Sequence, residues 1–276
     1  MPGGGLGVLT TLVAILAVAY GVVFLALYGL QRAMIFKPDR STPSRQAVGL
    51  DVMRDVVLHT ADGLELGAWY SPPQPGRPTV LYFHGNAGNR GWLAHKAGPY
   101  LADGYGLLLP DYRGYGGNPG VPTEDGLRAD ARAAVEFLRS EGAEPARDVI
   151  YHGESLGSGV AAWLASVEPP RALVMEAAFT SVPALAARQY PWLPTRVAVR
   201  DRFTSIRRVR SITVPTLFVH GVNDGLVPVD HARSLFQASA ARVKDLHILP
   251  GGLHADLYDH GADRLILQWL SGLQDY

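Results

Sequence analysis

The sequence predicts an α/β fold: a mostly parallel, twisted sheet with helices on both faces, preceded by one apolar N-terminal helix. Short runs that are apolar throughout, such as TVLYFHG at 79–85, alternate with helix-length segments, which is the pattern of strands buried on both faces of a parallel sheet. Two runs that flank Ala61–Gly63 indicate a hairpin at the start of the sheet. The N-terminus carries a long stretch without charge, unlike everything that follows it.

Composition excludes several classes of function. The chain has 276 residues, enough for one complete α/β core, and its 25 Lys and Arg are matched by 25 Asp and Glu, so no basic excess points to nucleic acid. Cysteine is absent, which excludes disulfides, thiolate zinc sites and a cysteine nucleophile and leaves the redox compartment open. No P-loop, dinucleotide fingerprint or metal-ligand spacing occurs, so we expect neither a cofactor nor a metal. The sequence leaves the oligomeric state open.

The N-terminal stretch predicts a membrane anchor. Residues 6–30 carry no charged side chain, and at about 1.5 Å per residue they are long enough to cross a hydrocarbon core of about 30 Å. A cleaved signal peptide is the alternative, because Ala17–Ala19 resembles a cleavage site, but residues 1–5 lack the basic side chains that such a peptide needs. We therefore expect a retained, single-pass transmembrane helix.

The flanking charges predict the orientation of this helix. Only the terminal amine precedes residues 6–30, whereas four basic residues follow them: Arg32, Lys37, Arg40 and Arg45. The positive-inside rule then places the bulk of the protein on the cytoplasmic face of the membrane. The expected organisation is an anchor, a linker and a catalytic domain, at residues 6–30, 31–50 and 51–276.

The remaining elements alternate along the chain. The hairpin strands are expected at 52–60 and 64–71, and the later strands at 79–85, 105–112, 148–153, 171–177, 214–221 and 244–251. Helices are expected at about 90–102, after Thr123 as N-cap, at 156–167 and at 262–270. Residues 177–213 interrupt the alternation between two core strands, and we expect a small cap there.

The stretch YHGESLGSGV at 151–160 carries the strongest chemical signal. A buried strand precedes it and a helix pattern follows it, so the chain must reverse within a few residues. Gly153 and Gly157 lie two residues before and after Ser155, where the absence of Cβ atoms allows the backbones to approach. This G-x-S-x-G pattern in a strand-turn-helix setting predicts a nucleophile elbow with Ser155 exposed at its apex.

A serine nucleophile needs a base and an acid that orients the base. In folds of this kind the chain order is serine, then an acid, then histidine, and the groups follow the carboxyl ends of strands. Asp224 follows the strand at 214–221, and His254 follows the last strand, so we assign them these roles. His260 and Asp230 are the nearby alternatives, but each lies where a helix is expected to begin.

The oxyanion hole needs two backbone N–H groups near the nucleophile. Leu156, the residue after Ser155, is expected to supply one. The loop HGNAGN at 84–89 follows an early strand, and its glycines allow a tight fold beneath the elbow, so Asn86 or Ala87 is expected to supply the other. Arg113 and Tyr115 are expected to brace the sheet edge against this loop.

Six motifs along the chain can be taken together: FHGNAGNR, LLPDYRGYGGNPG, YHGESLGSGVA, EAAFTS, PTLFVHGVNDGLVP and GGLHADL. They resemble one branch of the α/β-hydrolases, the membrane-anchored lipid esterases, lysophospholipases and depalmitoylases. The resemblance spans nearly the whole chain from residue 50 and includes the anchor. It implies the α/β-hydrolase fold with a small cap, Ser155 as nucleophile, Asp224 as acid and His254 as base. Glu154 is bulkier and more charged than the pattern suggests, which leaves the openness of the pocket undecided.

These observations predict a serine hydrolase that cleaves carboxylic esters through an acyl-enzyme, with single-chain lipid esters as substrates. Acyl-protein thioesters and small water-soluble esters are the alternatives, and a non-enzymatic membrane scaffold is disfavoured because all three triad positions are filled. The cap carries an apolar group and then a basic one: Leu185, Tyr190, Pro191, Trp192, Leu193 and Pro194, followed by Arg196, Arg200, Arg202, Arg207, Arg208 and Arg210. The apolar group either packs the cap onto the core or forms an acyl channel with a cationic rim.

Overall fold

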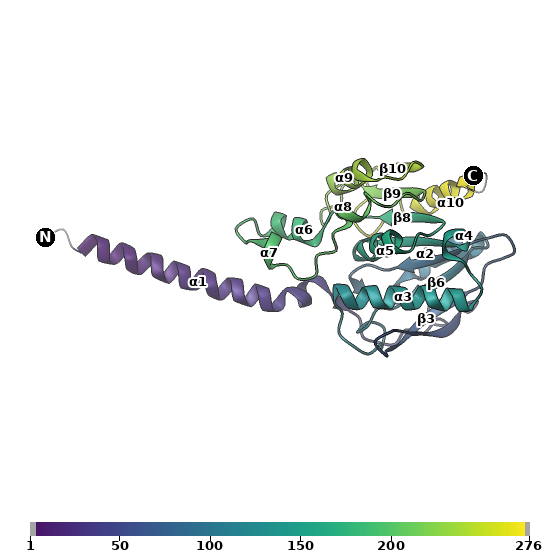
Figure 1. Cartoon of the computed structure of the whole chain (residues 1–276), viewed down its shortest axis with the longest axis horizontal. Coiled ribbons are helices and arrows are strands. Elements are labelled where there is room, and N and C mark those ends of the chain that lie inside the picture. Colours follow the sequence, from purple (N-terminus) through teal and green to yellow (C-terminus); the bar gives the residue numbers. More distant parts are fainter. Residues whose placement is uncertain (1–3, 274–276) are drawn as a thin grey trace.

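The computed structural model describes residues 4–273 and confirms the α/β-hydrolase fold class (Figure 1). Within these residues one sheet has the strand order β10-β9-β8-β7-β4-β6-β3-β2, in which β2 and β3 run antiparallel to their neighbours and the other pairs are parallel. The strands of this sheet are β2 (Arg54–His59), β3 (Glu65–Ser71), β4 (Thr79–Phe83), β6 (Gly106–Pro110), β7 (Val149–Glu154), β8 (Ala172–Glu176), β9 (Thr216–Gly221) and β10 (Lys244–Leu249).

Helices cover both faces of the sheet because its central strands are apolar on both sides. Every residue of β4, β6, β8 and β9 is buried. One apolar cluster joins the sheet to the helices of one face, and a second cluster joins it to the helices of the other. The first face carries α3 (Glu124–Ser140), α5 (Leu156–Val167) and α9 (Asp230–Ala238), and the second carries α2 (Ala94–Ala102) and α10 (Ala262–Gly272). Thr123 caps α3 as expected, its Oγ1 accepting the Gly126 N–H at 2.9 Å.

The N-terminal helix α1 (Gly4–Ile35) projects from the domain (Figure 1). By length and composition it is long and apolar enough to cross a membrane over Gly7–Ile35. Immediately after it, β1 (Lys37–Pro38) pairs in parallel with β5 (Ala87–Gly88), which lies in the loop after β4. The segment that follows the helix is therefore joined directly to the loop after β4, at the carboxyl edge of the sheet.

The cap between β8 and β9 lies alongside α1. It contains α6 (Val182–Gln189), α7 (Thr195–Ala198) and α8 (Ser205–Arg208). The Trp192 and Tyr20 rings meet edge to face with centroids 5.9 Å apart, and Arg32 of α1 pairs with Asp201 at 2.8 Å. Trp192 thus contacts the N-terminal helix and not the core, a partner that neither interpretation of the cap anticipated.

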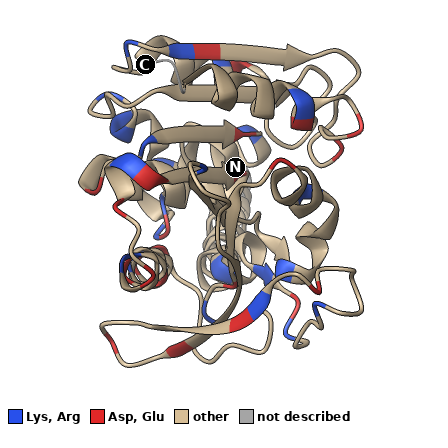
Figure 2. Cartoon of the chain, turned by 90° about the vertical axis from the view of Figure 1, so that its right-hand side faces the viewer, with Lys and Arg blue, Asp and Glu red and all other residues tan. Residues whose placement is uncertain are grey.

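Charged residues of both signs are interspersed along the ribbon (Figure 2). This distribution agrees with the formal net charge of +0. Two short elements remain. Helix α4 (Pro145–Asp148) leads into β7, and the 3₁₀ turn η1 (Arg90–Leu93) leads into α2.

Candidate active site

Ser155 lies at a sharp turn between β7 and α5. Its backbone adopts φ 50° and ψ −115°, a region that residues other than glycine rarely occupy. The flanking glycines explain how the turn closes: a Cβ on Gly153 would lie 2.4 Å from the Gly157 carbonyl oxygen, and a Cβ on Gly157 would lie 2.0 Å from the Phe83 carbonyl oxygen. The close approach of the three segments requires glycine at both positions.

The structure brings Ser155, His254 and Asp224 together at the carboxyl edge of the sheet. His254 follows β10, and its Nε2 lies 2.9 Å from the Ser155 Oγ. The other ring nitrogen, Nδ1, lies 2.7 Å from Oδ2 of Asp224, which follows β9. The alternatives are engaged elsewhere: Asp230 pairs with Arg233 at 3.1 Å, and His260 lies 3.6 Å from Asp256.

Asp224 is held as a carboxylate by the groups around it. Its Oδ1 accepts the N–H groups of Leu226 and Val227 at 2.9 and 2.8 Å, and the His220 ring lies 3.3 Å from Oδ2. Burial by itself raises the pKa of the Asp224 carboxyl, but the hydrogen bonds from His220 and His254 outweigh it and hold this pKa well below its usual range. The Asp224 carboxyl is therefore ionised and can accept a hydrogen bond from the Nδ1–H of His254.

A cavity of about 210 Å³ opens in front of Ser155. Asn86, Ala87 and His254 line it together with Ser155. The Asn86 carbonyl accepts the Lys37 N–H and the Tyr115 hydroxyl, each at 2.9 Å. These bonds orient the loop that was expected to carry the second oxyanion donor, while Leu156 begins α5 on the other side of Ser155.

The side chain of Asn86 is itself committed to the end of α1. Its Nδ2 donates to the Ile35 carbonyl at 2.9 Å. The side-chain amide is therefore used to hold the loop, which leaves backbone N–H groups as the donors available to an oxyanion. No sequence signal pointed to this bond, because it joins residues 51 positions apart through a single main-chain oxygen.

The two expected braces have different partners. Tyr115 contacts the loop through Asn86, as expected. The expectation for Arg113 was wrong, because its guanidinium pairs with Asp130 and Asp62, both at 2.7 Å. Arg113 therefore ties α3 to the hairpin turn and not to the oxyanion loop.

A buried charge network lies behind the elbow, and the sequence did not indicate it. Lys96 is 2% exposed and pairs with Glu154 at 2.9 Å and with Glu176 at 2.7 Å. Glu176 also accepts from the His152 ring at 3.0 Å, and its carbonyl accepts the Ser155 N–H at 2.9 Å. Burial raises the pKa of Glu176, but Lys96 and His152 more than offset it and keep this pKa low. The network fixes Glu154 against the cavity wall.

Lys96 gave no sequence signal because lysines on helices are mostly exposed and almost never fully buried unless they are paired. Its two carboxylate partners lie on the neighbouring strands β7 and β8, which are far along the chain from α2, so the pairing exists only once the sheet has formed. Among residues 4–273 no group of three or more His, Cys, Asp or Glu side chains is arranged to hold a metal ion.

The arrangement of Ser155, His254 and Asp224 is the one that serine hydrolases use. Two family models match the chain: the model for the alpha/beta hydrolase fold matches residues 78–205, and the model for serine aminopeptidase S33 matches residues 199–261. An uncharacterized protein of Mycobacterium tuberculosis is 44% identical over 248 residues, which cover 88% of this chain and 87% of that protein. The alpha/beta hydrolase domain-containing protein WAV2 of Arabidopsis thaliana is 30% identical over 256 residues, covering 84% and 80%. The chain belongs to the α/β-hydrolase family.

Two further similarities extend the comparison. The lysophosphatidylserine lipase ABHD12 of Danio rerio is 29% identical over 236 residues, which cover 71% of this chain and 61% of that protein. The solved structure of an esterase from Pyrococcus furiosus superposes with a TM-score of 0.70 at 19% identity, covering 87% of this chain and 98% of the esterase. The structural similarity includes nearly the whole of that enzyme's fold.

Proposed function

We propose that this chain is a membrane-anchored serine hydrolase that cleaves carboxylic esters of single-chain lipids, such as lysophospholipids or monoacylglycerols, through an acyl-enzyme on Ser155. One observation carries the proposal: an unbroken hydrogen-bonded chain runs from Ser155 Oγ through both nitrogens of His254 to Asp224. The strained elbow presents that serine at the mouth of a cavity that an ester carbonyl can enter.

The chemistry follows from this geometry. Asp224 accepts a hydrogen bond from the Nδ1–H of a neutral His254, which leaves Nε2 free to take the Ser155 proton as Oγ attacks the ester carbonyl. The developing oxyanion is bound by the Leu156 N–H and by an N–H of the Asn86–Ala87 segment. His254 then returns the proton to the leaving alcohol, and a water molecule activated by the same ring releases the acid from Ser155.

Features outside the triad support a lipid substrate. Helix α1 is long and apolar enough to cross a membrane, and as an anchor it keeps the domain beside the bilayer. The cap that packs on α1 combines exposed Trp192 with arginines such as Arg196 and Arg200. Cationic side chains near an anionic membrane surface are each worth about 1 kcal/mol of attraction. The relative ABHD12 is named as a lipase of a single-chain phospholipid, which agrees with this substrate class.

The catalytic domain is proposed to face the cytoplasm, because the basic residues of the chain's first fifty positions lie in the last turn of α1 or after it. A C-terminal reporter that is active only in the cytoplasm should be active on this protein. Activity of a reporter that works only outside the cytoplasm would contradict this orientation.

The test of the substrate class is a series of kcat/KM values on the full chain with esters from two to sixteen acyl carbons. Burial of each methylene stabilises the transition state by about 0.8 kcal/mol, so kcat/KM should rise roughly fourfold per methylene until the site is full. The Ser155→Ala variant provides the background rate. A profile that peaks at acetyl and falls with length would leave a small-ester hydrolase, and preferential turnover of acyl-protein thioesters would make it a thioesterase.

A further inference from the structure

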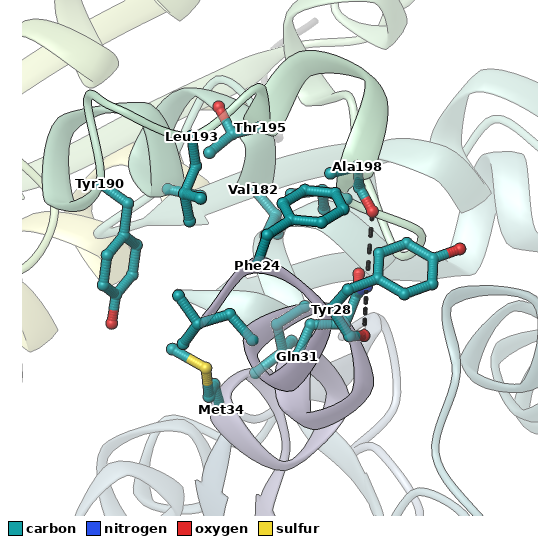
Figure 3. Close-up of a pocket in the computed structure, with 13 residues that line it drawn as sticks. Phe24, Tyr28, Gln31, Met34, Val182, Tyr190, Leu193, Thr195 and Ala198 are labelled. Carbon is teal, nitrogen blue, oxygen red and sulfur yellow. Dashed lines mark hydrogen bonds between the residues drawn. The ribbon is translucent and has the colours of Figure 1, made fainter. Parts of the chain in front are cut away.

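An apolar groove lies between α1 and the cap, outside the cavity of Ser155. Its volume is about 160 Å³. Phe24, Leu27 and Met34 line it from α1, and Val182 and Leu193 line it from the cap. Figure 3 shows the side chains of Phe24, Val182 and Leu193 in the space between the two elements. Most of the side chains that line the groove are apolar, which favours a hydrocarbon occupant over a polar one.

The groove lies at the depth of the membrane interface if α1 spans the bilayer. α1 has 32 residues and is therefore about 48 Å long, whereas the hydrocarbon core is about 30 Å thick. Roughly the last twelve residues of the helix, which include every groove residue from Phe24 to Ile35, can then lie at or beyond the edge of the hydrocarbon. A lipid chain can pass from the bilayer to the groove without crossing water.

Cationic and polar groups border one side of the groove. The Arg200 guanidinium lies 4.4 Å from the centre of the Tyr28 ring, and its Nε donates to the Tyr28 hydroxyl at 3.0 Å. Gln31 accepts the Arg200 N–H at 2.8 Å. These contacts tie the cap to α1 along one side of the groove.

One hydrogen bond links the lining of the groove to the lining of the cavity at Ser155. Ile35 lines the groove, and its carbonyl accepts the Asn86 side-chain amide at 2.9 Å. Asn86 in turn lines the cavity of Ser155. A residue of the groove wall is therefore bonded directly to a residue of the cavity wall.

We propose that this groove is the binding site for the hydrocarbon chain of a single-chain lipid, with the N-terminal helix as one wall of the site. The inference rests on the proposed ester hydrolase function and adds that the membrane helix takes part in substrate selection. The chain enters from the membrane interface, lies between α1 and the cap, and leaves the ester at the Ile35–Asn86 end, beside Ser155.

The first test fills the groove. Ala186 lines it from α6, so Ala186→Trp should shorten the acyl-length profile of the full chain in vesicles, with a loss in kcat/KM of roughly fourfold for each methylene that the groove no longer buries. Val197→Trp is the matched control, because Val197 belongs to the same cap but is 82% exposed and should leave the profile unchanged. Identical profiles for the wild type and both variants would overturn the proposal while leaving ester hydrolysis intact.

The second test measures binding without turnover. The full-length Ser155→Ala chain in phosphatidylcholine vesicles is photolabelled with a long-chain lysophospholipid that carries a diazirine at the end of its chain. The adducts should map to residues 182–199 of the cap, and Ala186→Trp should reduce them several-fold while Val197→Trp does not. Equal labelling of this segment in all three proteins, or its absence from the cap, would refute the groove. If the wild type cleaves no ester, the proposed function fails and this labelling still decides the groove.

Discussion

The catalytic edge of the sheet and the contact between the cap and α1 are built in opposite ways. At the catalytic edge, main-chain atoms approach so closely that glycine is required, and each polar group of the triad has a buried partner. At the cap, a few side chains meet the N-terminal helix through ring contacts and single hydrogen bonds, such as that of Tyr20 with Trp192. The first region is closely packed and holds its side chains in one arrangement, whereas the second leaves room for a flexible chain.

This difference separates chemistry from selection. Attack on a carbonyl requires exact placement of nucleophile, base and oxyanion donors, which a rigid sheet edge provides. Selection of a hydrocarbon chain requires only apolar area of adequate length, which a looser contact provides. Substitutions at the sheet edge should therefore reduce turnover of every ester, whereas substitutions at the cap should change the order of preference among esters.

The largest effect is expected from the triad. Ser155→Ala and His254→Ala should each lower kcat by about 10⁶-fold, and the double variant should be little worse, because the two groups act as one unit. Steady-state kinetics on a short p-nitrophenyl ester give all three values. Additive losses in the double variant would show that the residues act independently.

The elbow itself provides the next largest effect. Gly157→Ala would place a methyl group 2.0 Å from the Phe83 carbonyl oxygen, so we expect loss of activity and a free energy of unfolding lowered by several kcal/mol. Gly272→Ala is the control, because a Cβ at that helical position has nothing within 4 Å. Denaturant melts with both variants measure the difference, and a stable, active Gly157→Ala protein would contradict the steric account.

A third comparison separates β1 from the apolar part of α1. Removal of residues 1–30 should leave activity on short esters, because β1 and its bonds to the oxyanion loop are retained. Removal of residues 1–40 takes β1 away and should lower kcat by about 10²–10³, the cost of one displaced oxyanion donor. Equal kcat values for the two truncated chains would show that the loop keeps its shape without β1.

The smallest effect concerns acid stability. The folded-state pKa of Asp224 lies below its value of about 3.9 in the unfolded chain, so the carboxylate contributes stability that is present above about pH 4 and lost as the pH falls below it. The free energy of unfolding of Asp224→Asn should therefore fall less steeply between about pH 5 and pH 3 than that of the wild type. Parallel pH profiles would contradict the assignment.

The placement of Ser155, Asp224 and His254 at one edge of the sheet could be predicted because the constraints on each residue are local. Two glycines around Ser155 follow from the sterics of one tight turn, and Asp224 and His254 each follow the carboxyl end of a parallel strand. The pairing of β1 with β5 was not predictable, because two-residue strands have no periodicity. Contacts of the cap with α1 escaped prediction for another reason: exposed apolar and basic side chains have many possible partners, and only the assembled fold selects among them.

The most direct test of the central claim is the site of covalent labelling by a fluorophosphonate probe. The probe reacts with a serine only where a base activates the hydroxyl and donors stabilise the charge on phosphorus-bound oxygen. We expect one adduct per wild-type chain, located on Ser155 by peptide mass spectrometry, and none on folded Ser155→Ala. An adduct on another residue of the wild type, or labelling that persists in Ser155→Ala, would contradict it.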